Sequence, residues 1–541
     1  FYKREYAEYT VTLYADAGVV PEGTEVTIKK VKYVDDTDVS QIVNDNLPPN
    51  SSLENIVAFD ISLLLDGEEI QPFGSVEVQI KSKKQKADTS LTTRVFHIEQ
   101  ENMVEEMAFE MEEDNVIGVI ADSFSVYALV LTSEEYSSIY TVDDFLSMTS
   151  ENNYILENDL DFSGLDNYSG IAFKGVFDGN GYAIRNFNIE NWKVSNVSNT
   201  SKERFNAYLG LFGKLDGATV KNLKIIDSSV IFDGTSYSTD DREGFNFFEA
   251  GLLAAQANNS MIEGCIIENS ICDISNVDGS QTANVGGIVG KASGITIVNS
   301  SISGSIDMGD VTPTYLSLGG VAGALDTFSS VEKSVNHADV RITGRSSEID
   351  SVGGIIGTGG TMVQCLNTGN ITFEGEAEPA CVGGLAGTIN FAVDCFNIGN
   401  IYLNCNVIPN ACTISGCGDL DDNGSLKNVY TLGSIVVANK EQVDEDKDFG
   451  ILFTDRSTTD YSVEVENAYY LNSLKTDGFL KEYFANRSNC AVPLTNEEMK
   501  NPSSYEGFDF ETVWKIGGDL YPYPVLQWLN QDLEMPDIPE I

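Results

Sequence analysis

Histidine is nearly absent from this chain, since only His97 and His337 occur among 541 residues. A zinc peptidase of the His-Glu-x-x-His type places two histidines on one helix face, and these two are far apart in the sequence. The nine cysteines contain no Cys-x-x-Cys pair, so the thiolates of a zinc knuckle are missing as well. Zinc peptidase chemistry is therefore excluded for this segment, and we expect His97 in a strand and His337 in a turn.

Positive charge is also scarce, with 32 Lys and Arg against 83 Asp and Glu and a formal net charge of −51. Such a surface repels phosphate backbones and anionic membranes, which argues against nucleic-acid and lipid partners. No run of about 18 apolar residues occurs, so the sequence predicts no membrane insertion. Hydrophobic residues still make up 42% of the chain, enough for the cores of two or three domains.

The two ends of the chain carry no targeting signal. The sequence begins at Phe1 without a Met or a signal-peptide pattern, and residues 531–541 are typical of a Pro-containing linker. We therefore expect a mature or excised segment of a longer protein, with its targeting signals elsewhere.

The first 133 residues contain short alternating apolar segments that predict β-strands. Asp66-Gly67 follows one of them and is a strong hairpin-turn signal. Several short strands joined by turns predict a small β-sandwich over residues 1–133. The segments are residues 11–14, 26–31, 61–65, 76–80 and 124–130.

Residues 134–150 are expected to form a linker and a short helix that covers the first open coil of a repeat array. Thr141 precedes this helix and Asp144 lies three residues later, which is the arrangement of a capping box with Asp in place of Glu.

A short glycine motif recurs through the middle of the chain, consisting of a Gly, two small or aliphatic residues and often a second Gly. The first glycines are 30 to 41 residues apart, and such a spacing indicates a stacked array. Because the segments between motifs are strand-like, with turns at Gly and Asn, we predict a right-handed parallel β-helix of about ten coils. It should span residues 151–475 and end in a cap over residues 476–530. The motifs are Gly210-Leu-Phe-Gly213, Gly251-Leu-Leu-Ala254, Gly287-Ile-Val-Gly290, Gly320-Val-Ala-Gly323, Gly354-Ile-Ile-Gly357 and Gly384-Leu-Ala-Gly387, with weaker copies at Gly416-Cys-Gly418 and Gly450-Ile-Leu452.

Two columns of identical residues test this prediction. Asn336, Asn367 and Asn397 occupy like positions, and in a stack with a spacing of about 4.8 Å they would form an amide ladder. Cys365 and Cys395 are 30 residues apart and should stack as well. They could form a disulfide, but two thiols packed as small apolar groups are the commoner outcome in such a core.

The glycine repeats resemble GLUG-motif β-helix proteins, as do Phe173-Lys-Gly-Val-Phe-Asp-Gly-Asn-Gly-Tyr182 and Ile184-Arg-Asn-Phe187. That family includes the non-catalytic N-terminal region of bacterial IgA1-specific metalloendopeptidases. Phe508-Asp-Phe-Glu-Thr-Val-Trp514 and Tyr521-Pro-Tyr-Pro-Val-Leu-Gln-Trp528 look like the C-terminal end of such helices. The N-terminal module is similar to β-modules of wall-anchored Gram-positive surface proteins. The resemblance implies an extracellular protein, secreted or attached to the cell wall.

Two inserts precede the first two glycine motifs, at residues 191–208 and 232–249. Extra loop in a solenoid gathers on one edge, which is often the binding edge. Aromatic residues with an arginine suit the centre of an interface, although the three phenylalanines could instead pack into the coil wall as a strand. The candidate binding residues are Trp192, Tyr208, Tyr237, Arg242, Phe245, Phe247 and Phe248.

Asp419-Leu-Asp-Asp-Asn-Gly424 matches the first half of an EF-hand loop, so Asp419, Asp421 and Asn423 are candidate Ca²⁺ ligands. Position twelve of the loop is Tyr430 instead of a bidentate Glu, and the flanking segments are strand-like. An acidic turn of the β-helix is the favoured interpretation, and we expect no cofactor.

These features favour a non-enzymatic surface adhesin or binding scaffold, monomeric, with a host glycoprotein or glycan as its partner. The resemblance to the IgA1 peptidase region makes immunoglobulin one host protein to consider. A β-helix polysaccharide lyase or hydrolase is the enzymatic alternative, but it needs two or three converging carboxylates and no such group recurs at coil spacing. A passive stalk that presents another domain is the third interpretation.

Overall fold

The computed structural model describes the chain except residues 16, 35, 48–50, 84–90, 100–102, 108, 113–115, 166–167, 191–194, 198–203, 238–244, 279–281, 313–314, 344–349, 376–380, 406–409, 419–424, 439–448, 451–463, 474–490, 530–532 and 534–541. The chain divides into two compact units, Phe1–Ser137 and Ser138–Ile541. Both are built mainly of β-strands, as predicted. None of the helices within the described ranges is long and apolar enough to cross a lipid bilayer.

The first unit is a sandwich of two antiparallel sheets, with strand orders β1-β2-β8-β12-β11 and β10-β9-β13-β6-β3, and with β7 paired to β6. Asp66 and Gly67 join β6 to β7 at positive φ values of 54° and 85°, as the favoured hairpin turns require. His97 lies in strand β9, as predicted. The strands are β1 (Tyr2–Glu5), β2 (Tyr9–Tyr14), β3 (Glu25–Val31), β6 (Ser51–Leu65), β7 (Glu68–Ile70), β8 (Val76–Ser82), β9 (Thr92–Ile98), β10 (Val104–Met107), β11 (Glu110–Glu112), β12 (Val116–Ala121) and β13 (Val126–Glu134).

Strand β13 is buried on both faces, because a helix covers the outer face of its sheet. Tyr127 and Leu129 face the core between the two sheets. Ala128 and Val130 belong to a second core beneath α1 (Val39–Asn44). This helix was not predicted from the sequence.

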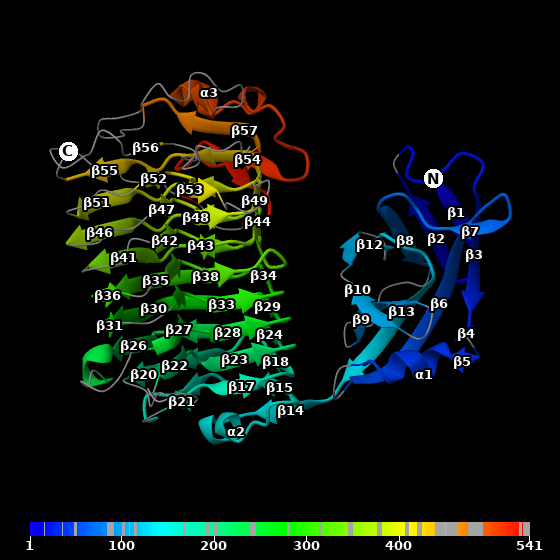
Figure 1. Ribbon diagram of the computed structural model, residues 1–541, viewed down its shortest axis with the longest axis horizontal. Helices are drawn as coiled ribbons and strands as arrows, with labels where there is room; N and C mark the ends of the chain where they lie inside the picture. Colours follow the sequence, from blue (N-terminus) through cyan, green and yellow to red (C-terminus); the bar gives the residue numbers. More distant parts are fainter. Residues whose placement is uncertain are drawn as a thin grey trace. The chain divides into compact units, whose positions relative to one another are not determined.

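The second unit is a parallel β-helix, which Figure 1 shows as a stack of coils. Sheet 1 runs from β14 (Tyr136–Ile139) to β58 (Val492–Leu494). Sheet 2 consists of β17 (Ile171–Phe173), β23 (Phe212–Asp216), β28 (Ala254–Asn258), β33 (Val289–Ser293), β38 (Ala322–Leu325), β43 (Ile356–Thr358), β48 (Ala386–Ile389) and β53 (Ser415–Gly418). Sheet 3 consists of β21 (Ser195–Val197), β22 (Arg204–Leu209), β27 (Phe245–Gly251), β32 (Thr282–Gly286), β37 (Tyr315–Gly319), β42 (Asp350–Gly353), β47 (Cys381–Gly383), β52 (Asn410–Cys412) and β56 (Phe449–Gly450).

Helix α2 (Val142–Leu146) begins where the capping residues predict. Thr141 accepts a hydrogen bond from the backbone of Asp144, whose carboxylate accepts one from the backbone of Thr141. Phe145 of this helix is fully buried and packs against Phe177 and Phe212 of the first coils. The helix therefore closes the core that the first coil would otherwise expose.

The predicted asparagine ladder is confirmed. Nδ2 of Asn336 donates to Oδ1 of Asn367 at 2.8 Å, and Nδ2 of Asn367 donates to Oδ1 of Asn397 at 2.9 Å. Each amide also donates to a carbonyl two residues further along its own chain segment. His337 lies in the first of these turns, as expected. The ladder joins three coils at buried positions, where an unpaired amide would cost about 1–3 kcal/mol.

Cys365 and Cys395 stack as predicted, and both are free thiols. The backbone N–H of Cys365 donates to Sγ of Cys395 at 3.3 Å. Cys381, in contrast, is disulfide-bonded, which the sequence did not reveal. Cys265 and Cys272 are also buried free thiols.

Thiol titration without reductant should separate these classes of cysteine. In the folded protein the buried thiols should react slowly, because burial raises the pKa of Cys265 to about 12 and leaves little reactive thiolate. After unfolding, nine cysteines less the two of one disulfide leave at most seven reactive thiols. Nine reactive thiols would contradict the disulfide at Cys381.

The structure corrects the register of the glycine motif in two coils. The motif pattern aligned Gly251 with Gly287. The strands instead pair Gly251 with Gly286, one residue earlier. Gly383 pairs with Cys412, so the weak copy assigned at Gly416 is wrong. Four coils have two adjacent glycines, and the sequence alone does not show which of them begins the corner.

A C-terminal strap, residues 492–529, covers the outside of sheet 1. It contains α3 (Asn496–Met499), β59 (Trp514–Ile516) and β60 (Pro524–Leu526). Its aromatic side chains bury an apolar column that points outward from the coils. The column consists of Val335, Leu366, Phe396, Tyr430 and Tyr469 in successive strands β40 (Val335–Asn336), β45 (Leu366–Asn367), β50 (Phe396–Asn397), β54 (Ser425–Thr431) and β57 (Glu464–Leu471).

Candidate binding groove

Sheets 2 and 3 meet at a tight corner of each coil. A Cβ atom on Gly290 would lie 2.7 Å from the backbone N of Ala250 and 2.7 Å from the carbonyl O of Ala255, both in the preceding coil. Glycine therefore allows the backbones to approach closely at this corner. Side chains of the two sheets face each other outside the corner, because Oγ of Ser317 and Oγ1 of Thr358 hydrogen-bond across it at 2.9 Å.

Two columns of side chains line this corner in the first coils. One column lies on sheet 3, where Tyr208 of β22, Glu249 of β27 and Asn284 of β32 are in register. The other lies on sheet 2, where β23, β28 and β33 are in register. Phe247 is two residues before Glu249 and so lies on the same face of β27. We call this set the corner groove: Tyr208, Phe247, Glu249 and Asn284 of sheet 3 with Lys214, Gln256 and Lys291 of sheet 2.

Both lysines of the corner groove lie over aromatic rings. Nζ of Lys214 is 4.0 Å from the ring centroid of Tyr208, and Nζ of Lys291 is 5.7 Å from that of Phe247. Cation–π contacts of this kind stabilise by about 0.5–1 kcal/mol at exposed sites. Phe247 is 38% exposed, so part of its ring remains available to a ligand.

Glu249 is the buried carboxyl of the corner groove. It is 1% exposed, and its Oε2 has no hydrogen-bond partner among the described residues. Burial raises the pKa of Glu249 from 4.5 to about 7, and the attraction of Lys291 and then of Lys214 opposes this shift only in part. The carboxyl group therefore titrates in the neutral range, where it can act as either a donor or an acceptor.

Two asparagines next to Glu249 also have unpaired polar atoms. Nδ2 of Asn284, a residue that is 2% exposed, has no partner within the described part of the chain. The same holds for Oδ1 of Asn206 in β22. Buried polar atoms without partners are rare in folded proteins, so this cluster of three marks a place where a ligand or water would complete the hydrogen bonds.

Of the residues predicted from the inserts, the structure brings Tyr208 and Phe247 together in the corner groove. The prediction that Phe248 is a binding residue is wrong. It is fully buried, and its ring lies 5.0 Å from that of Phe232. Because successive strand residues point to opposite faces, Phe247 points outward and Phe248 points into the core.

Other predicted positions lie outside what the structure describes. These are Trp192 and Arg242, the side chains of Tyr237 and Phe245, and the candidate Ca²⁺ ligands Asp419, Asp421 and Asn423. Over the described residues, the structure contains no group of three or more His, Cys, Asp or Glu side chains that could hold a metal ion.

Glu249 and both lysines were not predicted from the sequence. One signal could have found Glu249, because it is the charged residue of strand β27, whose other residues are Phe, Ala and Gly apart from Asn246. Lys214 and Lys291 had no such signal. Each lies in an ordinary strand, and its aromatic and acidic neighbours come from strands that are distant in the sequence.

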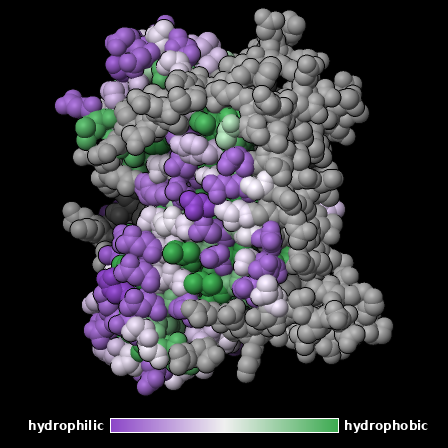
Figure 2. Space-filling model, turned by 90° about the vertical axis from the view of Figure 1, so that its left-hand side faces the viewer, coloured by the Kyte–Doolittle hydropathy of each residue, from purple (hydrophilic) through white to green (hydrophobic). Residues whose placement is uncertain are grey.

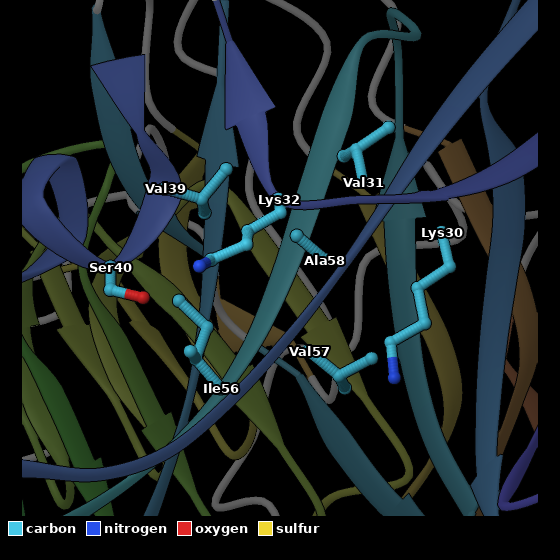
Figure 3. Close-up of a pocket in the computed structure, with 8 residues that line it drawn as sticks. All are labelled: Lys30, Val31, Lys32, Val39, Ser40, Ile56, Val57 and Ala58. Carbon is cyan, nitrogen blue, oxygen red and sulfur yellow. The ribbon is translucent and has the colours of Figure 1, made fainter.

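A pocket of 260 Å³ lies in the first unit, beside α1 and strands β3 and β6 (Figure 3). It is the open edge of the core beneath α1. Nζ of Lys32 is 3.6 Å from Oδ2 of Asp38, so this cation of the lining already has an acidic partner. The lining includes no His, Asp or Glu that could act as a general base for the hydroxyl of Ser40. It consists of Lys30, Val31, Lys32, Val39, Ser40, Ile56, Val57 and Ala58.

The side of the protein seen in Figure 2 is mostly hydrophilic where its residues are coloured. Hydrophobic residues form small separate groups among the polar ones there. This pattern is typical of a solvated surface rather than of a broad apolar interface.

The second unit is a parallel β-helix with polar and aromatic side chains in register along one corner of its first coils. No family model matches the chain, and no curated protein is significantly similar to it. Among solved structures, an IgA1 protease is similar over 85% of this chain and 34% of its own, with 16% sequence identity and a TM-score of 0.33. The catalytic domain of a GH87 alpha-1,3-glucanase in complex with nigerose is similar over 83% of this chain and 99% of its own, with 9% identity and a TM-score of 0.17. The chain thus spans about a third of the length of the IgA1 protease.

Proposed function

We propose that this protein is an extracellular surface scaffold that holds a glycan along the corner groove without cleaving it. The observation that supports this most is the cluster of unpaired buried polar atoms of Glu249 and Asn284 beside the exposed ring of Phe247. Binding sites of this kind combine apolar or aromatic walls with a few placed polar groups. Sugar hydroxyls can pair with the amide and carboxyl groups, while the C–H faces of the sugar rings pack on the aromatic side chains.

Cleavage of the glycan is the enzymatic alternative. Glycoside hydrolysis uses two carboxyl groups on either side of the scissile bond, and the corner groove as defined has one, Glu249. Incubation with acidic and neutral polysaccharides tests this. New reducing ends or unsaturated ends would overturn the non-enzymatic proposal.

The ligand class is tested with an array that carries glycans and plasma proteins, immunoglobulin included. Binding to glycans supports the proposal. If a plasma protein still binds after its glycans are removed, the ligand is a protein surface and not a glycan. An array without any bound ligand would favour the passive stalk.

Phe247→Ala should weaken glycan binding by more than about 1 kcal/mol, the size expected for an aromatic anchor. The melting temperature should stay nearly unchanged, because this side chain points out of the coil. Phe248→Ala is the matched control, since it removes the neighbouring ring from the core and should lower the melting temperature. If Phe247→Ala binds the glycan as tightly as the wild type, the glycan binds outside the corner groove.

A further inference from the structure

Lysines are scarce in this acidic chain, and those of the β-helix have different neighbours. Three of them pair with acidic groups: Lys174 with Asp216 at 3.8 Å, Lys221 with Asp178 at 3.7 Å and Lys427 with Glu466 at 3.1 Å. Lys214 and Lys291 lie over aromatic rings instead. Within the described ranges, no carboxylate forms an ion pair with either of them, so both ammonium groups can serve an anionic ligand.

The strand register places these two cations on either side of one carboxyl group. Lys214 belongs to the coil before Glu249 and Lys291 to the coil after it, because both pair through Gln256 of the intervening coil. Strands of neighbouring coils are about 4.8 Å apart, so the two lysines are about 10 Å apart along the helix axis. An extended polymer that lies along the groove can contact both lysines, whereas a small anion contacts one.

We propose that the ligand of the corner groove is an acidic polysaccharide that lies along the coils, with carboxylates of successive sugars paired to Lys214 and Lys291 on either side of Glu249. This inference rests on the proposed function and names its ligand class. Phe247, which is 38% exposed, offers a ring on the same face of β27 as Glu249.

Protonation of Glu249 decides whether its carboxyl attracts or repels the ligand. The charged or titratable groups that face it from the elements packed against β27 are Lys214 of β23, Lys291 of β33 and Tyr208 of β22. Since the pKa of Glu249 is about 7, the carboxyl is uncharged below neutral pH and does not repel an anionic ligand. Above neutral pH it is ionised, repels the carboxylate of the ligand and competes with it for the two lysines. Affinity should therefore fall as the pH rises through this range.

The experiment uses the full chain and paired polymers, measured by calorimetry at low ionic strength, where charge contributions are least screened. The probes are polygalacturonate, alginate and hyaluronan, each beside its carboxyl-reduced form, which keeps the backbone and loses the charge. At about pH 6 we expect an acidic polymer to bind at least about tenfold more tightly than its reduced form. Its affinity should drop several-fold by about pH 8.

Substitutions then separate the contributions of the three groups. Lys214→Met and Lys291→Met should each weaken binding of the acidic polymer about tenfold and leave the reduced polymer unaffected. Glu249→Gln is uncharged at every pH, so the affinity of this variant should remain high and lose its pH dependence. Lys224→Met, on sheet 1, is the matched control and should bind like the wild type.

The outcomes distinguish this inference from the function on which it rests. Equal binding of the acidic and reduced polymers would overturn the acidic ligand, while loss of binding in Phe247→Ala would still support a glycan in the groove. An unchanged pH dependence in Glu249→Gln would overturn the role of that carboxyl. If neither form of any polymer binds and the array shows no glycan, the proposed function fails and the inference fails with it.

Discussion

Trp514→Ala should lower the free energy of unfolding of the β-helix by about 3–5 kcal/mol, the range for truncation of a large buried aromatic residue. The indole is fully buried. Its ring centroid lies 4.7 Å from that of Phe508 in the strap and 5.8 Å from that of Phe396 on sheet 1. Its Nε1 donates to Oδ1 of Asp394 at 3.0 Å. The substitution therefore leaves a cavity and removes a donor from a carboxyl whose pKa burial already raises.

Scanning calorimetry measures this effect, with Trp514→Phe as the control. Phenylalanine retains most of the ring packing but has no N–H group, so Trp514→Phe should lower the free energy of unfolding by about 1–2 kcal/mol. Equal losses in both variants would show that the hydrogen bond to Asp394 outweighs the packing. A loss below about 1 kcal/mol in Trp514→Ala would show that the strap contributes little to the stability of the coils.

Gly354→Ala should destabilise the β-helix by about 3 kcal/mol or more, at the upper end of the costs measured for overpacking. The added Cβ would lie 2.1 Å from the carbonyl O of Gly384 and 2.4 Å from Nδ2 of Asn367. The first atom belongs to the backbone of the next coil and the second to the buried asparagine ladder. Neither atom can move without breaking hydrogen bonds between coils, so the clash should destabilise the packing of one coil on the next.

Urea denaturation gives the loss, and Gly164→Ala in the same unit is the matched control. A Cβ on Gly164 would meet no heavy atom within 4 Å, so this variant should be neutral or slightly more stable through a less flexible unfolded chain, by up to about 1 kcal/mol. If both variants behaved alike, close approach of the coils at Gly354 would be refuted.

Several features could be predicted from the sequence because they repeat or act locally. The Asn336, Asn367 and Asn397 column was visible as a period, since each amide serves its own turn and the turn above it. Thr141 and Asp144 predicted the start of α2, because a cap involves residues three apart. The register of the glycine motif was harder to predict from the sequence. Cys412 takes the place of a glycine at one corner, and hydrogen bonding between coils decides this rather than composition.

The binding residues show a sharper division. Alternation along residues 245–251 left open whether Phe247 or Phe248 points outward, because both faces of that strand carry phenylalanine. Contact with the core settles the question for Phe248. Glu249 looked like one more acidic residue in a chain of net charge −51, and its raised pKa comes from burial that only folding produces.

The sequence by itself determined that this protein is a stack of β-strand coils behind a small β-sandwich, because similar turns and small residues recur from one coil to the next. Only the tertiary structure decided where its chemistry lies. Lys214, Glu249 and Lys291 belong to three successive coils and are separated by 35 and 42 residues. They become neighbours because parallel pairing brings successive coils to about 4.8 Å, a distance that no sequence pattern within one coil records.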